Sequence, residues 1–204
     1  MKRIVEVEAA QQADLDLLVE YNLAMAQESE DRGLDQNRLR GGVSRLLQRP
    51  RDGFYLVARV DGEPAGSLMV TYEWSDWRNG RFWWIQSVYV SPVFRRQGVY
   101  SAMHAKVREL ARADGDSCGI RLYVERENTG AMATYQALGM VETHYRLYEE
   151  EFASHPPPTG SSSSQPASGR CAPRQFTPSE LTPSQLTPSR CAGTAAQNSP
   201  LSRN

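Results

Sequence analysis

The segment from Val88 to Ser101, VYVSPVFRRQGVYS, has residue types that suit a phosphate-binding loop. An apolar run ends at Ser91-Pro92, a loop with Arg95, Arg96 and Gly98 follows, and a helical pattern then begins. The first N–H groups of a helix lack intrahelical partners and carry partial positive charge, so they bind anions. Gly98 lets a ligand approach the backbone, and the two guanidinium groups add positive charge. The pattern favours an anion site over its alternative, a plain strand-to-helix turn with two solvated arginines.

Other nucleotide and metal motifs are absent from the sequence. No G-x-x-x-x-G-K-[ST] occurs, and no G-x-G-x-x-G follows a predicted strand. The three cysteines, Cys118, Cys171 and Cys191, have neither the spacing of a metal site nor that of a disulfide framework. We therefore predict no metal site, and a phosphate held by a loop of another kind.

Hydrophobic periodicity predicts the elements that position this loop. A period of two predicts strands and a period near 3.6 predicts helices. Strands are predicted over 4–7, 54–58, 66–74, 82–90, 120–124 and 141–147, and helices over 13–30, 36–48, 97–113 and 128–138. Asp61-Gly62 predicts a tight hairpin, Asn128 an N-cap and Gly139 the residue after a helix end. The order predicts an α/β (α+β) fold, a mixed, largely antiparallel sheet of six or so strands with flanking helices.

Composition divides the chain into a predicted domain, 1–152, and a predicted disordered tail, 153–204. The tail holds nine of the twelve prolines and the related units FTPSE, LTPSQ and LTPSR. Such a segment has too little apolar surface to offset the entropy lost when a chain becomes ordered. A phosphorylation or docking role for these units is the alternative to a passive tail.

The chain has 23 basic and 24 acidic residues, which predicts neither nucleic acid nor membrane as a partner. No long apolar run and no signal-like N-terminus occur, so a cytoplasmic protein is predicted.

Two segments together resemble the GNAT superfamily of acetyl-CoA-dependent N-acyltransferases. The signature loop of that family is [Q/R]-x-x-G-x-[G/A], and here it reads RRQGVY from Arg95 to Tyr100. The family's second segment, N-x-x-A-x-x-x-Y-x-x-x-G-[F/M], is matched by Asn128, Ala131, Tyr135, Gly139 and Met140. The resemblance covers residues 3–148 and implies a GNAT-like acetyltransferase domain with acetyl-CoA as co-substrate.

The resemblance also implies how acetyl-CoA would bind. Its pyrophosphate would rest on the loop at the head of the third helix, formed by Arg95, Arg96, Gln97, Gly98, Val99, Tyr100 and Ser101. The pantetheine arm would pair with the backbone of Val88, Tyr89 and Val90, where two strands diverge. Asn128 is a further candidate contact, although helix capping explains it equally well. Tyr100 departs from the family's Gly or Ala, and we expect its side chain to point outward, away from the phosphate.

By the same resemblance, Tyr135 would be the general acid beside the cofactor sulfur. A phenol with an ordinary pKa of about 10 can protonate the leaving thiolate. From periodicity alone, Tyr135 would instead be part of the helix core. Direct transfer needs an uncharged amine, so a base or a water relay must remove a proton. Glu73, Asp76 and Glu125 are candidates by their order along the chain, with Glu73 taken as the catalytic partner of Tyr135.

The predicted function is an N-acetyltransferase that moves the acetyl group directly to a primary amine. Tyr123 stands where ribosomal-protein N-terminal acetyltransferases often have Glu, so a small-molecule acceptor is favoured over a protein N-terminus or lysine. An aromatic cluster could wall the acceptor pocket or simply be core; its members are Tyr72, Trp74, Trp77, Trp83 and Trp84. The alternative function is a non-catalytic acyl-CoA-binding or interaction module. A homodimer is compatible with these features.

Overall fold

Five strands form one sheet in the order β1-β2-β3-β4-β5 in the computed structural model, which describes residues 3–150 and 152. The strands are β1 (Val5–Ala9), β2 (Gly53–Val60), β3 (Glu63–Ser75), β4 (Gly80–Val90) and β5 (Ser117–Leu122). Neighbouring strands from β1 to β4 are antiparallel, whereas β4 and β5 are parallel. This mixed, mostly antiparallel sheet confirms the predicted fold class.

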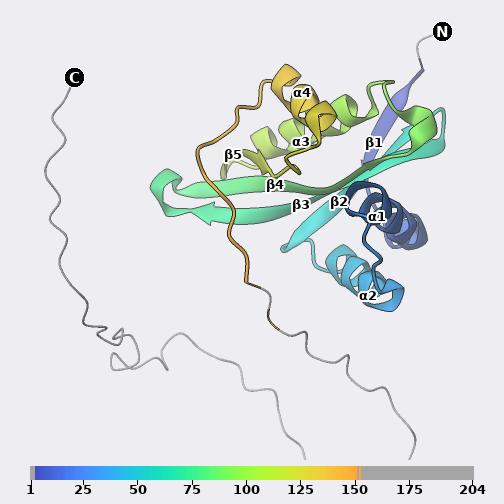
Figure 1. Ribbon diagram of the computed structural model, residues 1–204. Coiled ribbons are helices and arrows are strands. Elements are labelled where there is room, and N and C mark those ends of the chain that lie inside the picture. Colours follow the sequence, from blue (N-terminus) through green and yellow to red (C-terminus); the bar gives the residue numbers. More distant parts are fainter. Residues whose placement is uncertain (1–2, 151, 153–204) are drawn as a thin grey trace, which may run out of the picture. The chain divides into compact units, whose positions relative to one another are not determined.

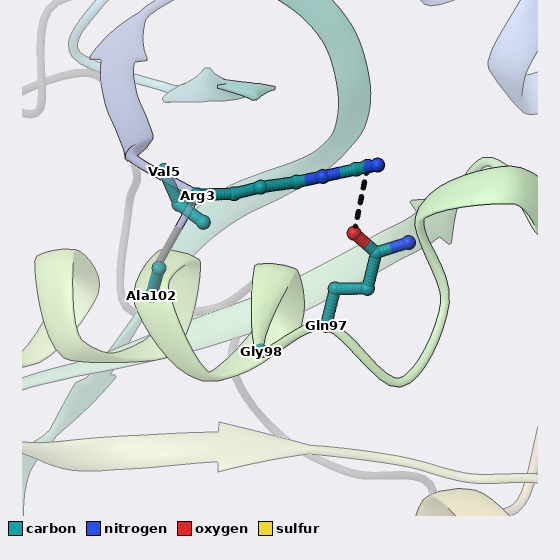
Figure 2. Close-up of a pocket in the computed structure, with 5 residues that line it drawn as sticks. All are labelled: Arg3, Val5, Gln97, Gly98 and Ala102. Carbon is teal, nitrogen blue, oxygen red and sulfur yellow. Dashed lines mark hydrogen bonds between the residues drawn. The ribbon is translucent and has the colours of Figure 1, made fainter. Parts of the chain in front are cut away.

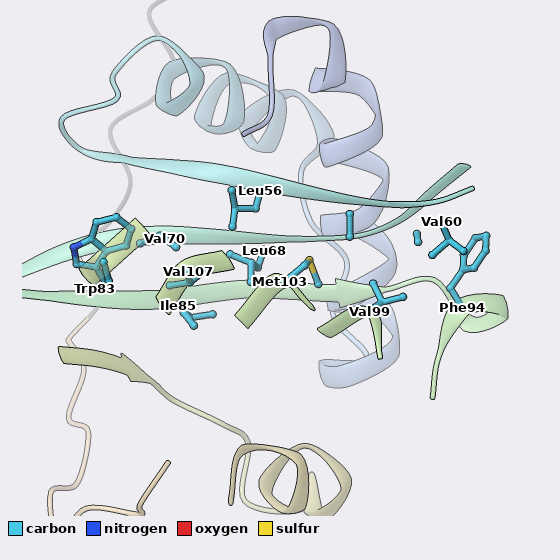
Figure 3. Packing of buried hydrophobic residues seen from close by; sticks show 13 residues of the cluster. Leu56, Val60, Leu68, Val70, Trp83, Ile85, Phe94, Val99, Met103 and Val107 are labelled. Atoms are coloured by element: carbon cyan, nitrogen blue, oxygen red, sulfur yellow. The ribbon is translucent and has the colours of Figure 1, made fainter. Parts of the chain in front are cut away.

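Helices cover both faces of the sheet (Figure 1). They are α1 (Leu15–Glu30), α2 (Gln36–Leu47), α3 (Val99–Ala113) and α4 (Thr129–Ala137). On one face, Met103 and Val107 of α3 pack against Leu68 and Ile85 in the main hydrophobic cluster (Figure 3). On the other face, side chains of α1 and α2 pack against Tyr55 and Val57 of β2. The sheet is therefore packed against helices on both faces, and α3 connects the parallel strands β4 and β5.

Local capping explains where several elements begin and end. Asp61 and Gly62 have φ angles of 51° and 86°, the left-handed pair that a two-residue hairpin between β2 and β3 requires. The Asn128 side chain accepts a hydrogen bond of 3.0 Å from the Ala131 N–H and so caps α4. Gly139 follows α4 with a φ of 84°. These features confirm the predicted hairpin and both predicted ends of the last helix.

The predicted strand over 141–147 is wrong, because the described residues after α4 form no strand. Val141 and Tyr145 are 86% and 80% exposed. Alternation shows only which side chains would share a face, and a strand also needs a partner edge for its backbone hydrogen bonds. This segment pairs with no described strand, so the described sheet has five strands rather than six.

The predicted tail, 153–204, lies outside the described residues. Within the described part of the chain, no helix has both the length and the apolar composition needed to cross a membrane.

Candidate functional site

Strands β4 and β5 are paired only over the first part of β4. Their register runs from Arg81 opposite Ser117 to Ile85 opposite Leu122, where β5 ends. A bulge lies directly after this point: between the pairs Met69–Gln86 and Ser67–Tyr89, β4 has two residues, Ser87 and Val88, and β3 has one, Leu68. Ser87 has a φ of 48°, and such bulges bend a strand. The backbone from Val88 to Val90 therefore extends past β5, leaving an opening between the two strands.

The loop after β4 leads directly to the head of α3. Buried Phe94 and Val99 anchor the two ends of this loop in the core. Gly98 is the N-cap of α3 with a φ of 82°, so the chain enters the helix in a left-handed conformation. The N–H groups from Gly98 to Ser101 belong to the first turn, where no intrahelical acceptor is available. They are unpaired donors at the start of α3, and helix ends of this kind can bind anions.

Arg3 adds positive charge next to this helix end. Its guanidinium donates a 3.0 Å hydrogen bond to the Gln97 side chain, which in turn donates to the Val93 carbonyl at 2.7 Å. Figure 2 shows Arg3 reaching across toward Gln97 above Gly98, at a cavity of about 550 Å³. Arg3 was not predicted as a site residue, because it lies 94 positions before Gln97 and no local pattern brings the two together.

The two arginines of the loop have different surroundings. Arg95 donates to the Val90 carbonyl at 2.9 Å and forms an ion pair with Glu28 of α1. Tyr89 also donates to Glu28, at 3.1 Å, and the hydrogen bond from Arg95 lowers the pKa of that carboxyl below its usual value. Arg96 forms no hydrogen bond or ion pair with the described residues. Arg95 therefore ties the loop to α1, and Arg96 is the loop cation available to an anion.

Tyr135 of α4 contacts Tyr100 of α3. Their ring centroids are 5.4 Å apart at an interplanar angle of 63°, an edge-to-face contact. Burial raises the pKa of both phenols. The Tyr100 ring also packs against the main hydrophobic cluster, so the expected outward side chain is wrong. Burying a large ring against Tyr135 removes apolar surface from water, which explains the inward direction.

The three candidate bases lie at two different ends of the sheet. Glu73 pairs with Phe82 of β4, and six residues of β3, roughly 20 Å, separate it from the level of Tyr89. The Glu73 carboxylate accepts a 2.7 Å hydrogen bond from Arg121. Asp76 follows β3 at the same end. Glu125 instead follows the end of β5 that borders the opening. The structure does not bring Glu73 or Asp76 together with Tyr135.

A Glu73→Gln variant tests this placement. We expect its kcat to stay within about twofold of the wild-type value, because six residues of β3, roughly 20 Å, separate Glu73 from the level of Tyr89. The partly exposed ion pair of Glu73 contributes only about 0–1 kcal/mol to stability. Steady-state assays of the variant and of Glu125→Gln would make the comparison. A tenfold loss of kcat in Glu73→Gln alone would place Glu73 in the proton path after all.

The aromatic residues near the β3–β4 connection do not form one cluster. Tyr72 and Trp83 pack edge to face at 5.5 Å on the side of α3. Trp84 projects from the opposite face, where it lies 6.3 Å from Tyr123. Successive side chains of a strand alternate between faces, so neighbours in the sequence are separated. Trp74 and Trp77 are exposed. A single aromatic acceptor pocket is therefore not supported.

Gln86 lies at the last paired level before the bulge and was missed by sequence analysis. Its amide donates to the Thr71 hydroxyl, and its carbonyl accepts a 3.4 Å hydrogen bond from Tyr123. Gln86 pairs with Met69, whose side chain packs against the α1–α2 cluster. These polar groups therefore line the face of the opening that lies opposite α3. A polar residue within the mostly apolar run from Phe82 to Val90 was the available signal.

Comparisons with known proteins agree with this geometry. Residues 16–140 match the acetyltransferase (GNAT) family. A structure from Clostridium difficile 630, described as a possible acetyltransferase, is 42% identical with a TM-score of 0.68, covering 74% of this chain and 99% of that one.

Curated relatives match over shorter segments. An uncharacterized N-acetyltransferase of Methanocaldococcus jannaschii is 34% identical over 98 residues, covering 48% of this chain and 42% of the relative. A thialysine N-epsilon-acetyltransferase of Bos taurus is 40% identical over 92 residues, covering 41% of this chain and 53% of the relative. The chain therefore spans about half the length of these relatives.

Proposed function

Because the chain belongs to the GNAT acetyltransferase family, we propose that it transfers the acetyl group of acetyl-CoA directly to the nitrogen of a primary amine. Family membership supports acetyltransferase as the enzyme class and acetyl-CoA as the co-substrate. One observation carries the proposal for this chain: the pairing of β4 and β5 ends at Ile85 and Leu122, beside the helix end at Gly98. A thioester lying in that opening would have its diphosphate at one end and Tyr135 near the other.

The diphosphate would be held by the N–H groups from Gly98 to Ser101. Arg96 and Arg3 would add charge-assisted hydrogen bonds to the diphosphate. Arg96 has no partner among the described residues, and Arg3 would exchange only its hydrogen bond to the neutral Gln97 amide. Arg95 would act indirectly, because Glu28 and the Val90 carbonyl already hold it. The arm would pair with the backbone from Val88 to Val90, as an added strand does.

In the reaction, the lone pair of a neutral amine attacks the thioester carbonyl, and the carbon–sulfur bond then breaks. The departing thiolate takes a proton from the Tyr135 hydroxyl, which burial keeps protonated. The ammonium formed on the acceptor loses its proton to Glu125 or to water, and that proton finally restores the Tyr135 phenol. Asn128 supports this chemistry by capping α4, the helix that carries Tyr135.

We propose that the acceptor is a small-molecule primary amine that enters from the face with Gln86, Thr71 and Tyr123. That set offers neutral hydrogen-bonding groups at the mouth of the opening. The similarity to thialysine N-epsilon-acetyltransferases supports an amine at the end of an amino-acid side chain. Thialysine and lysine are therefore the first acceptors to test, ahead of peptides with free N-termini.

The test is a panel of amines mixed with acetyl-CoA and the full chain. We expect thiol release to require both protein and amine, and mass spectrometry to find one acetyl group on the amine product. Polyamines, aminoglycosides and a lysine-containing peptide complete the panel. Tight acetyl-CoA binding without thiol release from any amine would contradict the proposal and favour a non-catalytic binding module.

The pH dependence follows from the Tyr135 pKa. Burial raises that pKa above its ordinary value, so the phenol remains a proton donor throughout the range in which amines lose their protons. We expect kcat/KM to rise with pH as the acceptor becomes neutral, without a decrease from Tyr135 below about pH 10. A descending limb below pH 9 that disappears in Tyr135→Phe would contradict this assignment.

A further inference from the structure

We propose that the Tyr100 side chain binds the acyl-pantetheine arm of acetyl-CoA, with its hydroxyl donating a hydrogen bond to a carbonyl oxygen of that arm. This inference rests on the proposed function, because acetyl-CoA is the ligand. It assigns to the side chain a role separate from that of the Tyr100 backbone N–H in the first turn of α3.

The position of Tyr100 supports a contact with the arm. Its backbone belongs to the helix end that would hold the diphosphate, and its ring touches Tyr135, which would lie near the sulfur. The arm is the part of acetyl-CoA that joins the diphosphate to the sulfur. If the diphosphate lies at the head of α3 and the sulfur near Tyr135, the arm between them must pass close to Tyr100, which lies at the first site and contacts Tyr135.

The Tyr100 hydroxyl is buried and has no hydrogen-bond partner among the described residues. Buried hydroxyl groups are almost always paired, because losing water without gaining a partner costs free energy. The buried tyrosines Tyr55 and Tyr89 follow this rule, with Asn22 and Glu28 as partners. Among the described hydroxyl groups, that of Ser67 in the core of β3 is also unpaired, but it lies outside the helix end. Burial raises the pKa of Tyr100, so its phenol stays protonated and offers a proton to an acceptor atom. The missing partner is thus a hydrogen-bond acceptor that a ligand would bring.

The surroundings of Tyr100 hold its ring in place before any ligand binds. His104, one helical turn further along α3, is only 3% exposed, and its ring centroid lies 6.0 Å from that of Tyr100. Tyr135 and residues of the main hydrophobic cluster also contact the Tyr100 side chain, which stays partly exposed. An ordered side chain binds at a lower entropic cost than a mobile one. The arm presents amide carbonyls and the thioester carbonyl, which share the required acceptor chemistry.

The experiment is calorimetric titration of Tyr100→Phe with three ligands. They are acetyl-CoA, CoA, which lacks the thioester carbonyl, and 3′-phospho-ADP, which keeps the diphosphate but lacks the arm. We expect the variant to bind acetyl-CoA about 3- to 10-fold more weakly than the wild type, and to bind 3′-phospho-ADP equally well. A matching loss with CoA would assign the bond to an amide carbonyl, and no loss with CoA would assign it to the thioester; both support the proposal.

Tyr55→Phe is the matched control, because it removes a buried hydroxyl on the other face of the sheet. Its acetyl-CoA affinity should not change, and its melting temperature should fall with the loss of the Asn22 bond. Tyr100→Phe without ligand should melt at the same or a higher temperature. Unchanged acetyl-CoA affinity in Tyr100→Phe, or an equal loss with 3′-phospho-ADP, would overturn the inference. A wild-type chain that binds no acetyl-CoA would overturn the proposed function as well, and the wild-type titration reveals that separately.

Discussion

Replacing Gly98 with glutamate is expected to weaken acetyl-CoA binding at least about 100-fold, because the new carboxylate would stand in the proposed diphosphate site. A Cβ atom built on Gly98 has no protein atom within 4 Å. The space in front of this residue is therefore open, and in the proposed binding mode a side chain there would meet the diphosphate. Calorimetric titration with acetyl-CoA measures the effect directly.

Two further variants separate ligand exclusion from backbone strain. Gly98 has a φ of 82°, so Gly98→Ala introduces strain of about 1 kcal/mol but little bulk and no charge. Gly62→Glu is the matched control, because Gly62 has a φ of 86° and is equally open, but lies in the β2–β3 hairpin. We expect Gly62→Glu to lose stability and to keep its acetyl-CoA affinity. Gly98→Ala should lose stability and bind acetyl-CoA more weakly than the wild type, but much more tightly than Gly98→Glu. Wild-type affinity in Gly98→Glu would refute the placement of the diphosphate.

Replacing Tyr135 with phenylalanine is expected to lower kcat about 100-fold while the Kd for acetyl-CoA changes less than about twofold. The substitution keeps the ring, and with it the edge-to-face contact with Tyr100. It removes the hydroxyl proton that, in the proposed mechanism, passes to the thiolate as the carbon–sulfur bond breaks. Thiol release under saturating acetyl-CoA and amine gives kcat, and calorimetry gives Kd.

Tyr145→Phe is the control for the loss of a phenol away from the opening, because Tyr145 is 80% exposed in the segment after α4. Its kcat should equal that of the wild type. If Tyr135→Phe also kept its full kcat, another group would have to protonate the thiolate. Equal losses in kcat and in cofactor affinity would instead indicate that Tyr135 holds the arm rather than acting as the acid.

Much of the fold could be predicted from local sequence because local physics determines it. The Asp61-Gly62 turn needs only two residues that tolerate positive φ, and Asn128 caps a helix through a neighbour three positions away. The alternation in β2 follows directly from helices on both faces of the sheet: Leu56 faces α3, and Tyr55 faces α1 and α2.

The strand predicted over 141–147 failed because pairing is not a local property. Its alternation is genuine, but the described residues offer it no hydrogen-bonded partner. The prediction of an outward Tyr100 side chain was wrong for a related reason. Its inward direction depends on Tyr135, which lies 35 positions away in another helix.

The loop of the candidate site could be predicted from the sequence, whereas the charged residues that pair with the predicted site residues could not. Gly98 and the head of α3 were predicted from one continuous segment. Glu28, which holds Arg95, is 67 positions from it, and Arg121, which holds Glu73, is 48 positions from that residue. Such ion pairs follow from sheet order and helix packing. They decide which of the predicted charges are available to a ligand.

A crystal structure of this chain with acetyl-CoA bound would test the proposed binding mode between β4 and β5. We expect diphosphate oxygens within hydrogen-bonding distance of the N–H groups from Gly98 to Ser101, the arm beside Val88–Val90, and the thioester sulfur next to the Tyr135 hydroxyl. A cofactor bound elsewhere, with β4 and β5 closed together past Ile85, would contradict it.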